Sequence, residues 1–142
     1  MRETIKFRVK DIGDFKLYVE PTMLDIQEIE NIAAEIAGGG LQLAEYKGHI
    51  AEFQTFVKTQ NDKDTADIGT TLNLAIFLQV KERLETIYKL ATLIVLSEET
   101  PVDYRNIPEP QFQSIYSAYE VALAHFRKEA RQPVHEDAGV SI

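Results

Sequence analysis

The stretch Phe-Lys-Leu-Tyr-Val-Glu-Pro-Thr-Met-Leu-Asp, residues 15–25, decides the fold, because the hydrophobic pattern changes there from that of a strand to that of a helix. Up to Glu20, apolar and polar residues alternate, which is the period of a half-buried strand. From Thr22 onward, apolar residues recur at spacings of three and four, as on an amphipathic helix. Thr22 followed by Asp25 is a weak form of the capping box that begins helices. The stretch therefore predicts a strand that leads directly into a helix.

Upstream of this stretch, a second alternating run predicts a partner strand. Ile5, Phe7 and Val9 alternate with basic residues, and residues 11–14 supply a short turn that contains a glycine. An isolated hairpin is only marginally stable in water, so its apolar face must pack on another element. We therefore predict a β-hairpin over residues 1–20 that rests on the rest of the chain.

Downstream, the helical period predicts four helices. The first runs from Thr22 to the glycines at 38–40, which end it. The others cover about 41–59, 72–97 and 110–131. The fold class is α+β, mainly α, in one globular domain over residues 1–131 (hairpin 1–20, helical part 22–131) with a mobile C-terminal tail over 132–142. We expect these side chains to be buried: Ile29, Ile32, Ile50, Phe53, Ile87, Leu123 and Phe126.

Composition excludes several classes of protein. The 142 residues include 15 Lys+Arg and 23 Asp+Glu, for a net charge of −8. That balance argues against nucleic-acid binding through a basic face, and against docking on anionic lipid. Cysteine is absent, the N-terminus lacks the apolar core of a signal peptide, and charges interrupt the apolar stretch 72–96. We expect an intracellular, soluble protein that binds neither nucleic acid nor membrane.

The charge is distributed unevenly. Residues 1–20 carry five basic and four acidic residues, whereas residues 21–69 carry three basic and nine acidic residues. The hairpin is thus net basic by +1 and the following segment net acidic by −6. Contacts between the two in neighbouring copies would be attractive.

The second predicted helix carries the strongest candidate for chemistry. Glu45, His49 and Glu52 can share one face, and carboxylate and imidazole groups bind divalent metals. Metal sites in helical bundles use Glu-x-x-His pairs, which this sequence lacks. A nucleophile elbow and a phosphate-binding loop are absent too. We interpret the face as solvated, and predict no enzyme activity, no metal and no cofactor.

The start of the third predicted helix is apolar nearly all round, which is typical of a helix covered on several sides. In so small a chain, part of that surface is expected to face a partner. Tyr104, in the connector 101–110, has no periodic explanation, and aromatic side chains often anchor interfaces. We predict that the partner-binding residues are Leu72, Ile76, Phe77 and Tyr104.

The whole pattern resembles the tail assembly chaperones of phages and prophages with long non-contractile tails. The likeness covers residues 1–131: a strand pair whose second strand ends in Tyr18-Val19-Glu20-Pro21-Thr22, several helices and a polar tail. The resemblance implies a non-enzymatic protein of the bacterial host cytoplasm that binds and solubilises the tape measure protein and helps recruit major tail protein. Such chaperones are absent from the mature virion. In many relatives a frameshift near the C-terminus adds a domain that contacts the tail tube protein.

Two alternatives to the chaperone remain open: a structural protein of the particle and an enzyme. A chaperone that follows a long partner is expected to self-associate head to tail into an open helical array. A head–tail connector or completion protein of the particle would instead form a closed ring. An enzyme would use the acidic face of the second helix as a metal site.

Overall fold

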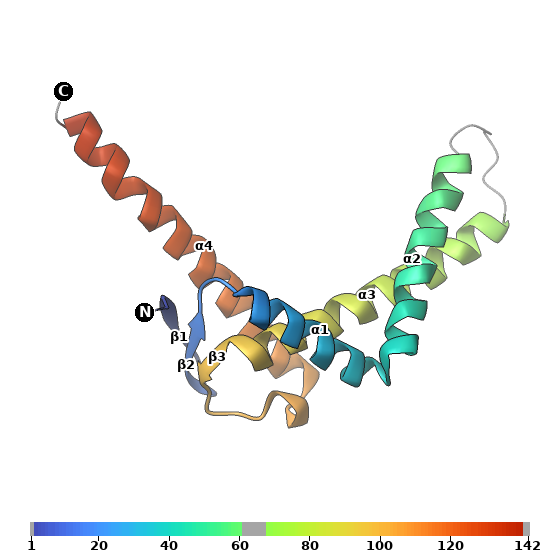
Figure 1. Cartoon of the computed structure of the whole chain (residues 1–142), viewed down its shortest axis with the longest axis horizontal. Coiled ribbons are helices and arrows are strands. Elements are labelled where there is room, and N and C mark those ends of the chain that lie inside the picture. Colours follow the sequence, from blue (N-terminus) through green and yellow to red (C-terminus); the bar gives the residue numbers. More distant parts are fainter. Residues whose placement is uncertain (1, 61–67, 141–142) are drawn as a thin grey trace. The chain divides into compact units, whose positions relative to one another are not determined.

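The computed structural model describes residues 2–60 and 68–140, and the side chains of residues 2–58 and 74–129. Over these residues the fold class predicted from the sequence is confirmed: a hairpin precedes four helices. The elements are β1 (Thr4–Val9), β2 (Gly13–Tyr18), α1 (Met23–Ala37), α2 (Gly40–Gln60), α3 (Ile68–Leu96), β3 (Ser97–Glu99), the 3-10 helix η1 (Tyr104–Asn106) and α4 (Glu109–Val140) (Figure 1). They group into two compact units: unit 1 is residues 1–25 with 93–142, and unit 2 is residues 26–92.

The hairpin of unit 1 has the predicted register. β1 and β2 pair antiparallel, with Ile5 opposite Leu17 and Phe7 opposite Phe15. The turn places Asp11 and Gly13 at positive φ, and a Cβ on Gly13 would lie only 2.8 Å from the Pro101 side chain. A glycine is therefore required at this turn by both backbone conformation and space.

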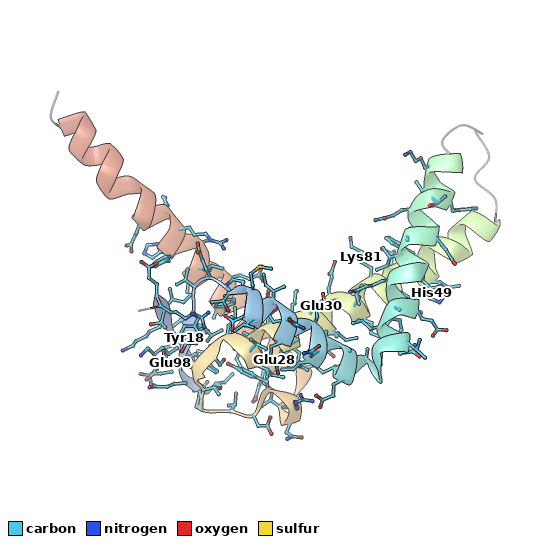
Figure 2. All side chains as sticks on the ribbon, in the orientation of Figure 1. Tyr18, Glu28, Glu30, His49, Lys81 and Glu98 are labelled. Carbon is cyan, nitrogen blue, oxygen red and sulfur yellow. The ribbon has the colours of Figure 1, made fainter. Side chains whose placement is uncertain are left out.

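A third strand completes the sheet, and the sequence did not predict it. β3 pairs antiparallel with β2, which gives the order β1-β2-β3. Lys16 Nζ lies 3.5 Å from Glu98 Oε1 across this pair (Glu98 is labelled in Figure 2). The predicted third helix, over 72–97, includes Ser97, which the structure places in β3. A strand of three residues is too short to show an alternating pattern, so its pairing comes from tertiary context.

The core of unit 1 lies between the sheet and the helices that follow it. The largest fully buried side chains are Phe15, Leu17, Leu93, Leu96 and Ile115. α4 packs against β1, where Tyr119 places its ring 6.2 Å from that of Phe7. The apolar face of the hairpin is thus covered, as its marginal stability alone requires.

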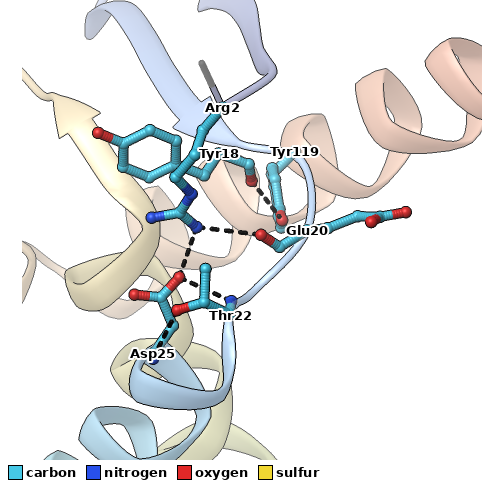
Figure 3. Close-up of polar contacts among 6 residues, drawn as sticks. All are labelled: Arg2, Tyr18, Glu20, Thr22, Asp25 and Tyr119. Carbon is cyan, nitrogen blue, oxygen red and sulfur yellow. Dashed lines mark hydrogen bonds and ion pairs between the residues drawn. The ribbon is translucent and has the colours of Figure 1, made fainter.

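The predicted N-cap of α1 is confirmed. The Thr22 amide donates to Asp25 Oδ2 at 2.9 Å, and the Asp25 amide donates to Thr22 Oγ1 at 3.1 Å (Figure 3). The Arg2 guanidinium donates to the same carboxylate and to the Glu20 carbonyl, and it lies 3.8 Å from the centre of the Tyr18 ring. The Thr22 amide, and after it Arg2, lower the pKa of Asp25. One carboxylate therefore starts the helix and holds the N-terminal strand to it.

Unit 2 is built on a small core. α1 and α2 join through Gly38 and Gly39, both at positive φ, as the predicted helix stop requires. The buried cluster is Ala33, Ala37, Leu43, Ile87 and Ala91. Ile87 confirms the core prediction, whereas the other predicted core residues are only half-buried: Ile29, Ile32, Ile50, Phe53, Leu123 and Phe126. In unit 2 the reason is that alanines occupy the closest helix contacts, so that larger side chains such as Ile29 and Ile32 pack at the rim.

Two helix ends differ from the prediction. α3 begins at Ile68 rather than at Leu72, and α4 continues to Val140, through most of the segment predicted as a tail. The backbone of that segment is helical to Val140, while its mobility stays a prediction. None of the helices, over the residues described, has an apolar run long enough to cross a bilayer.

Candidate partner-binding surface

The C-terminal half of α2 and the N-terminal part of α3 form an aromatic contact. The Phe53 and Phe77 rings stack with their centres 4.2 Å apart and their planes at 13°. Phe56 lies one turn along, with its ring 6.3 Å from that of Phe53. We call residues 49–58 of α2 together with 74–80 of α3 the arm. Its two helices run antiparallel, because Phe53 meets Phe77 while Tyr46 meets Arg83.

Apolar side chains remain exposed around this contact. The exposed fractions are 37% for Val57, 44% for Leu74, 46% for Ile76 and 52% for Leu78. Leu74 and Leu78 are four residues apart and share one face of α3, whereas Ile76 projects from the opposite side. The stacked phenylalanines thus have uncovered apolar neighbours on both sides. These side chains are therefore available for contact with another apolar surface.

A groove follows the Ile76 side of the arm. Its volume is about 290 Å³, and the described side chains that line it are His49, Glu52, Phe53, Phe56, Ile76 and Phe77. This is at or below the small end of the range for cofactor and ligand pockets. The groove suits one or two apolar side chains of a protein partner better than a cofactor.

The predicted partner-binding residues have different positions. Ile76 and Phe77 come together on the arm, with Ile76 exposed and Phe77 half-buried against Phe53. The backbone of Leu72 lies in α3, but its side chain is outside the described residues. Tyr104 needs a correction, because its side chain is only 6% exposed.

Tyr104 belongs to the core of unit 1. Its hydroxyl lies 2.6 Å from Ser97 Oγ, and its ring stacks 6.2 Å from that of Phe15. Asp103 caps the short helix η1 by accepting from the Arg105 amide, which turns Tyr104 inward. Since the sequence did not predict β3, it could not predict that Ser97 would be close to Tyr104.

The predicted acidic face of the second helix does not form a cluster of metal ligands among the described residues. His49 Nδ1 lies 4.0 Å from Glu52 Oε2, and both side chains are more than half exposed. No group of three metal-ligating side chains comes together anywhere in the described part of the chain. The two residues form a polar rim on the groove.

Polar contacts join α1 to the parts of α2 and α3 that adjoin the arm. The Tyr88 hydroxyl donates to Glu30 Oε2 at 2.8 Å, and Lys47 Nζ lies 3.3 Å from the same oxygen. Interaction with Tyr88, and then with Glu30, raises the pKa of Lys47, while burial raises the pKa of Tyr88. Glu30 thus links α1 to both α2 and α3.

Sequence reasoning missed part of this surface. Phe53 was assigned to the core, and Phe56, Val57, Leu74 and Leu78 were not assigned to a site. Residues 53–57 and 74–78 are both rich in apolar side chains, which indicates that the two helices meet there. This pattern does not indicate which side of each helix stays exposed.

The chain matches no protein-family model, no curated protein and no solved structure. The function must therefore be argued from the residues and the surfaces described above.

Proposed function

We propose that this protein is a non-enzymatic tail assembly chaperone that holds an aggregation-prone helical partner on its arm. The observation that carries the proposal is the set of exposed apolar side chains around the Phe53–Phe77 stack. In the proposed role the partner is the tape measure protein, and the protein acts in the cytoplasm of the bacterial host and leaves before the virion is complete.

The arm has the surface that such a partner requires. An amphipathic helix binds by placing side chains at positions i, i+3 or i+4, and i+7 into an apolar groove. The groove beside Ile76 can take one anchor, while Leu74 and Leu78 extend the apolar surface on the other side of the arm. Each Å² of apolar surface removed from water contributes about 25 cal/mol, so a covering helix of matching shape would bind favourably.

Self-association belongs to the same proposal. Lys6 and Arg8 are exposed on the net-basic hairpin, and Glu28 and Glu45 are exposed on the net-acidic helices. Contacts between these two regions in successive copies would be head to tail and would generate an open array. Exposed charges more than ~10 Å apart are largely screened at 0.1 M salt, so we expect the array to shorten as salt rises. The apolar contact to the partner should persist. The recruitment of major tail protein, through a frameshifted extension, completes the proposed role.

Co-expression with the tape measure protein tests the proposal. The parent chain should keep that protein soluble and should co-purify with it. The double variant Ile76→Asp/Leu78→Asp should lose this effect, because it places charges on both sides of the arm. Leu41→Asp is the matched control, since Leu41 is 89% exposed and lies at the start of α2, away from the arm.

Size measurements separate the proposal from the connector. A chaperone array should give a concentration-dependent ladder of species that shifts with salt. If the parent chain solubilises no helical partner and forms a single closed ring, the chaperone proposal fails and the head–tail connector replaces it.

A further inference from the structure

We infer that the outer edge of β1 and the adjoining face of α4 form a docking site for an extended acidic segment of a partner protein, which adds to the sheet as a further strand. This site lies in unit 1 and does not involve the arm, so it can fail without affecting the proposed binding of the helical partner. It does use Lys6 and Arg8, the basic residues of the proposed self-association contact, so the two contacts would compete.

The outer edge of β1 carries unpaired backbone groups. In the order β1-β2-β3, the described part of the chain places a strand on only one side of β1. The Val19 amide donates to the Glu3 carbonyl at 3.1 Å, so Glu3 and Val19 form a hydrogen-bonded pair between β1 and β2. Hydrogen bonding alternates along an antiparallel strand, so the amides and carbonyls of Lys6 and Arg8 point to the outer edge. An added strand would pair with these groups.

α4 supplies a floor for such a strand. A groove of about 440 Å³ runs beside β1, and its described lining is Phe7, Arg8, Ser117, Ala118, Val121, Ala122 and His125. Because β2 contributes none of this lining, the groove lies on the side of β1 away from β2. The α4 side chains are mostly small, and Val121 is 70% exposed. Alternate side chains of an added strand would therefore rest on Val121 and its apolar neighbours.

The charges at the edge favour an acidic occupant. Lys6 and Arg8 are exposed on the face of β1 that points away from α4. Arg8 Nε lies 3.9 Å from Asp14 Oδ1, but both side chains are 80% exposed, so this weak pair leaves Arg8 open to a further carboxylate. His125, the ionisable side chain that α4 contributes to the groove lining, lies 3.0 Å from Glu129 Oε1. The opposite edge of the hairpin already shows this preference, because Lys16 of β2 pairs with Glu98 of β3. A second copy fits poorly, since antiparallel pairing of two β1 edges would bring their basic residues together. The expected segment alternates apolar residues, facing α4, with acidic residues opposite Lys6 and Arg8.

A capped eight-residue peptide of alternating valine and glutamate is the probe. We expect the full-length protein to bind it, measured by fluorescence anisotropy, and the amides of Lys6 and Arg8 to become protected from hydrogen exchange. In an antiparallel pair the glutamates opposite Lys6 and Arg8 make the backbone bonds. N-methylation of the glutamate amides should therefore weaken binding at least tenfold, whereas N-methylation of the valine amides should weaken it much less. A valine–lysine peptide should not bind.

Variants of the protein locate the site. Lys6→Glu/Arg8→Glu and Val121→Asp should each weaken peptide binding at least tenfold, while Lys81→Glu, on α3 in unit 2 and outside the arm, should leave it unchanged. If Val121→Asp fails to fold, the two methylated peptides still decide the matter on the parent chain. The inference is overturned if no peptide binds, if both methylated peptides bind equally, or if the amides of Lys6 and Arg8 become protected by self-association without peptide.

Discussion

The Phe53–Phe77 stack allows a quantitative test of the arm. Replacing a buried phenylalanine by alanine costs ~3–5 kcal/mol. Phe53 is only half-buried, so Phe53→Ala should lose about half of that, or ~2 kcal/mol, in the free energy of unfolding. A well-placed aromatic pair adds ~0.5–1.5 kcal/mol beyond buried area, and the 4.2 Å separation with near-parallel planes falls at the close end of that geometry.

Urea unfolding of a double-mutant cycle measures the pair directly. The parent, Phe53→Ala, Phe77→Ala and the double variant should give a coupling free energy of ~0.5–1.5 kcal/mol. Leu41→Ala, on the same helix but 89% exposed, should change stability by less than ~0.5 kcal/mol. Strictly additive effects of the two phenylalanine variants would show that the rings do not stack, and the arm as described would be wrong.

Three further predictions concern the N-cap, the acidic face of α2 and two glycines. Because the pKa of Asp25 is lowered in the folded state, its charged form stabilises the fold at pH values above the ordinary pKa of 3.8, and this contribution is lost as pH falls through the folded-state pKa. Asp25→Asn removes this charge from the first turn of α1, so it should cost ~0.3–1 kcal/mol at pH 7 and flatten the acid limb of a thermal-melting pH profile. His49→Ala and Glu45→Ala should leave partner solubilisation intact, and a stoichiometric metal in the purified parent that either variant loses would revive the enzyme interpretation. Gly13→Ala should lower the melting temperature because of its positive φ and the nearby Pro101, whereas Gly48→Ala, with open space around it in α2, should stabilise the protein by ~0.5–1 kcal/mol; equal effects would contradict the turn geometry.

Local signals accounted for the parts of the fold that the sequence predicted. The alternation around Phe7 and Phe15 and the spacing of Thr22 and Asp25 depend on residues close in the chain, and both predictions hold. β3 could not be found in this way, because three residues carry no period. The position of Tyr104 followed from that strand, since its hydroxyl meets Ser97.

The candidate surface was predictable only in part, for a related reason. Periodicity shows that residues 74–80 are apolar on several sides, but not which sides another helix covers. Ile76, predicted to bind a partner, is exposed, whereas Phe53, predicted to lie in the core, is only half-buried. The identity of a small core residue is harder still, because an alanine such as Ala33 or Ala91 looks the same in sequence whether it lies inside or outside.

Those alanines determine how unit 2 can change over evolutionary time. Where helices meet on Ala33, Ala37 and Ala91, a larger side chain has no space and would push backbones apart, at a typical cost of ~1–3 kcal/mol. The bulky residues at the rim, such as Ile29 and Ile32, are only half-buried and can be exchanged for others of similar size. Among the core residues of unit 2, tolerance to mutation is thus the reverse of what side-chain size suggests, because the buried alanines are the least replaceable.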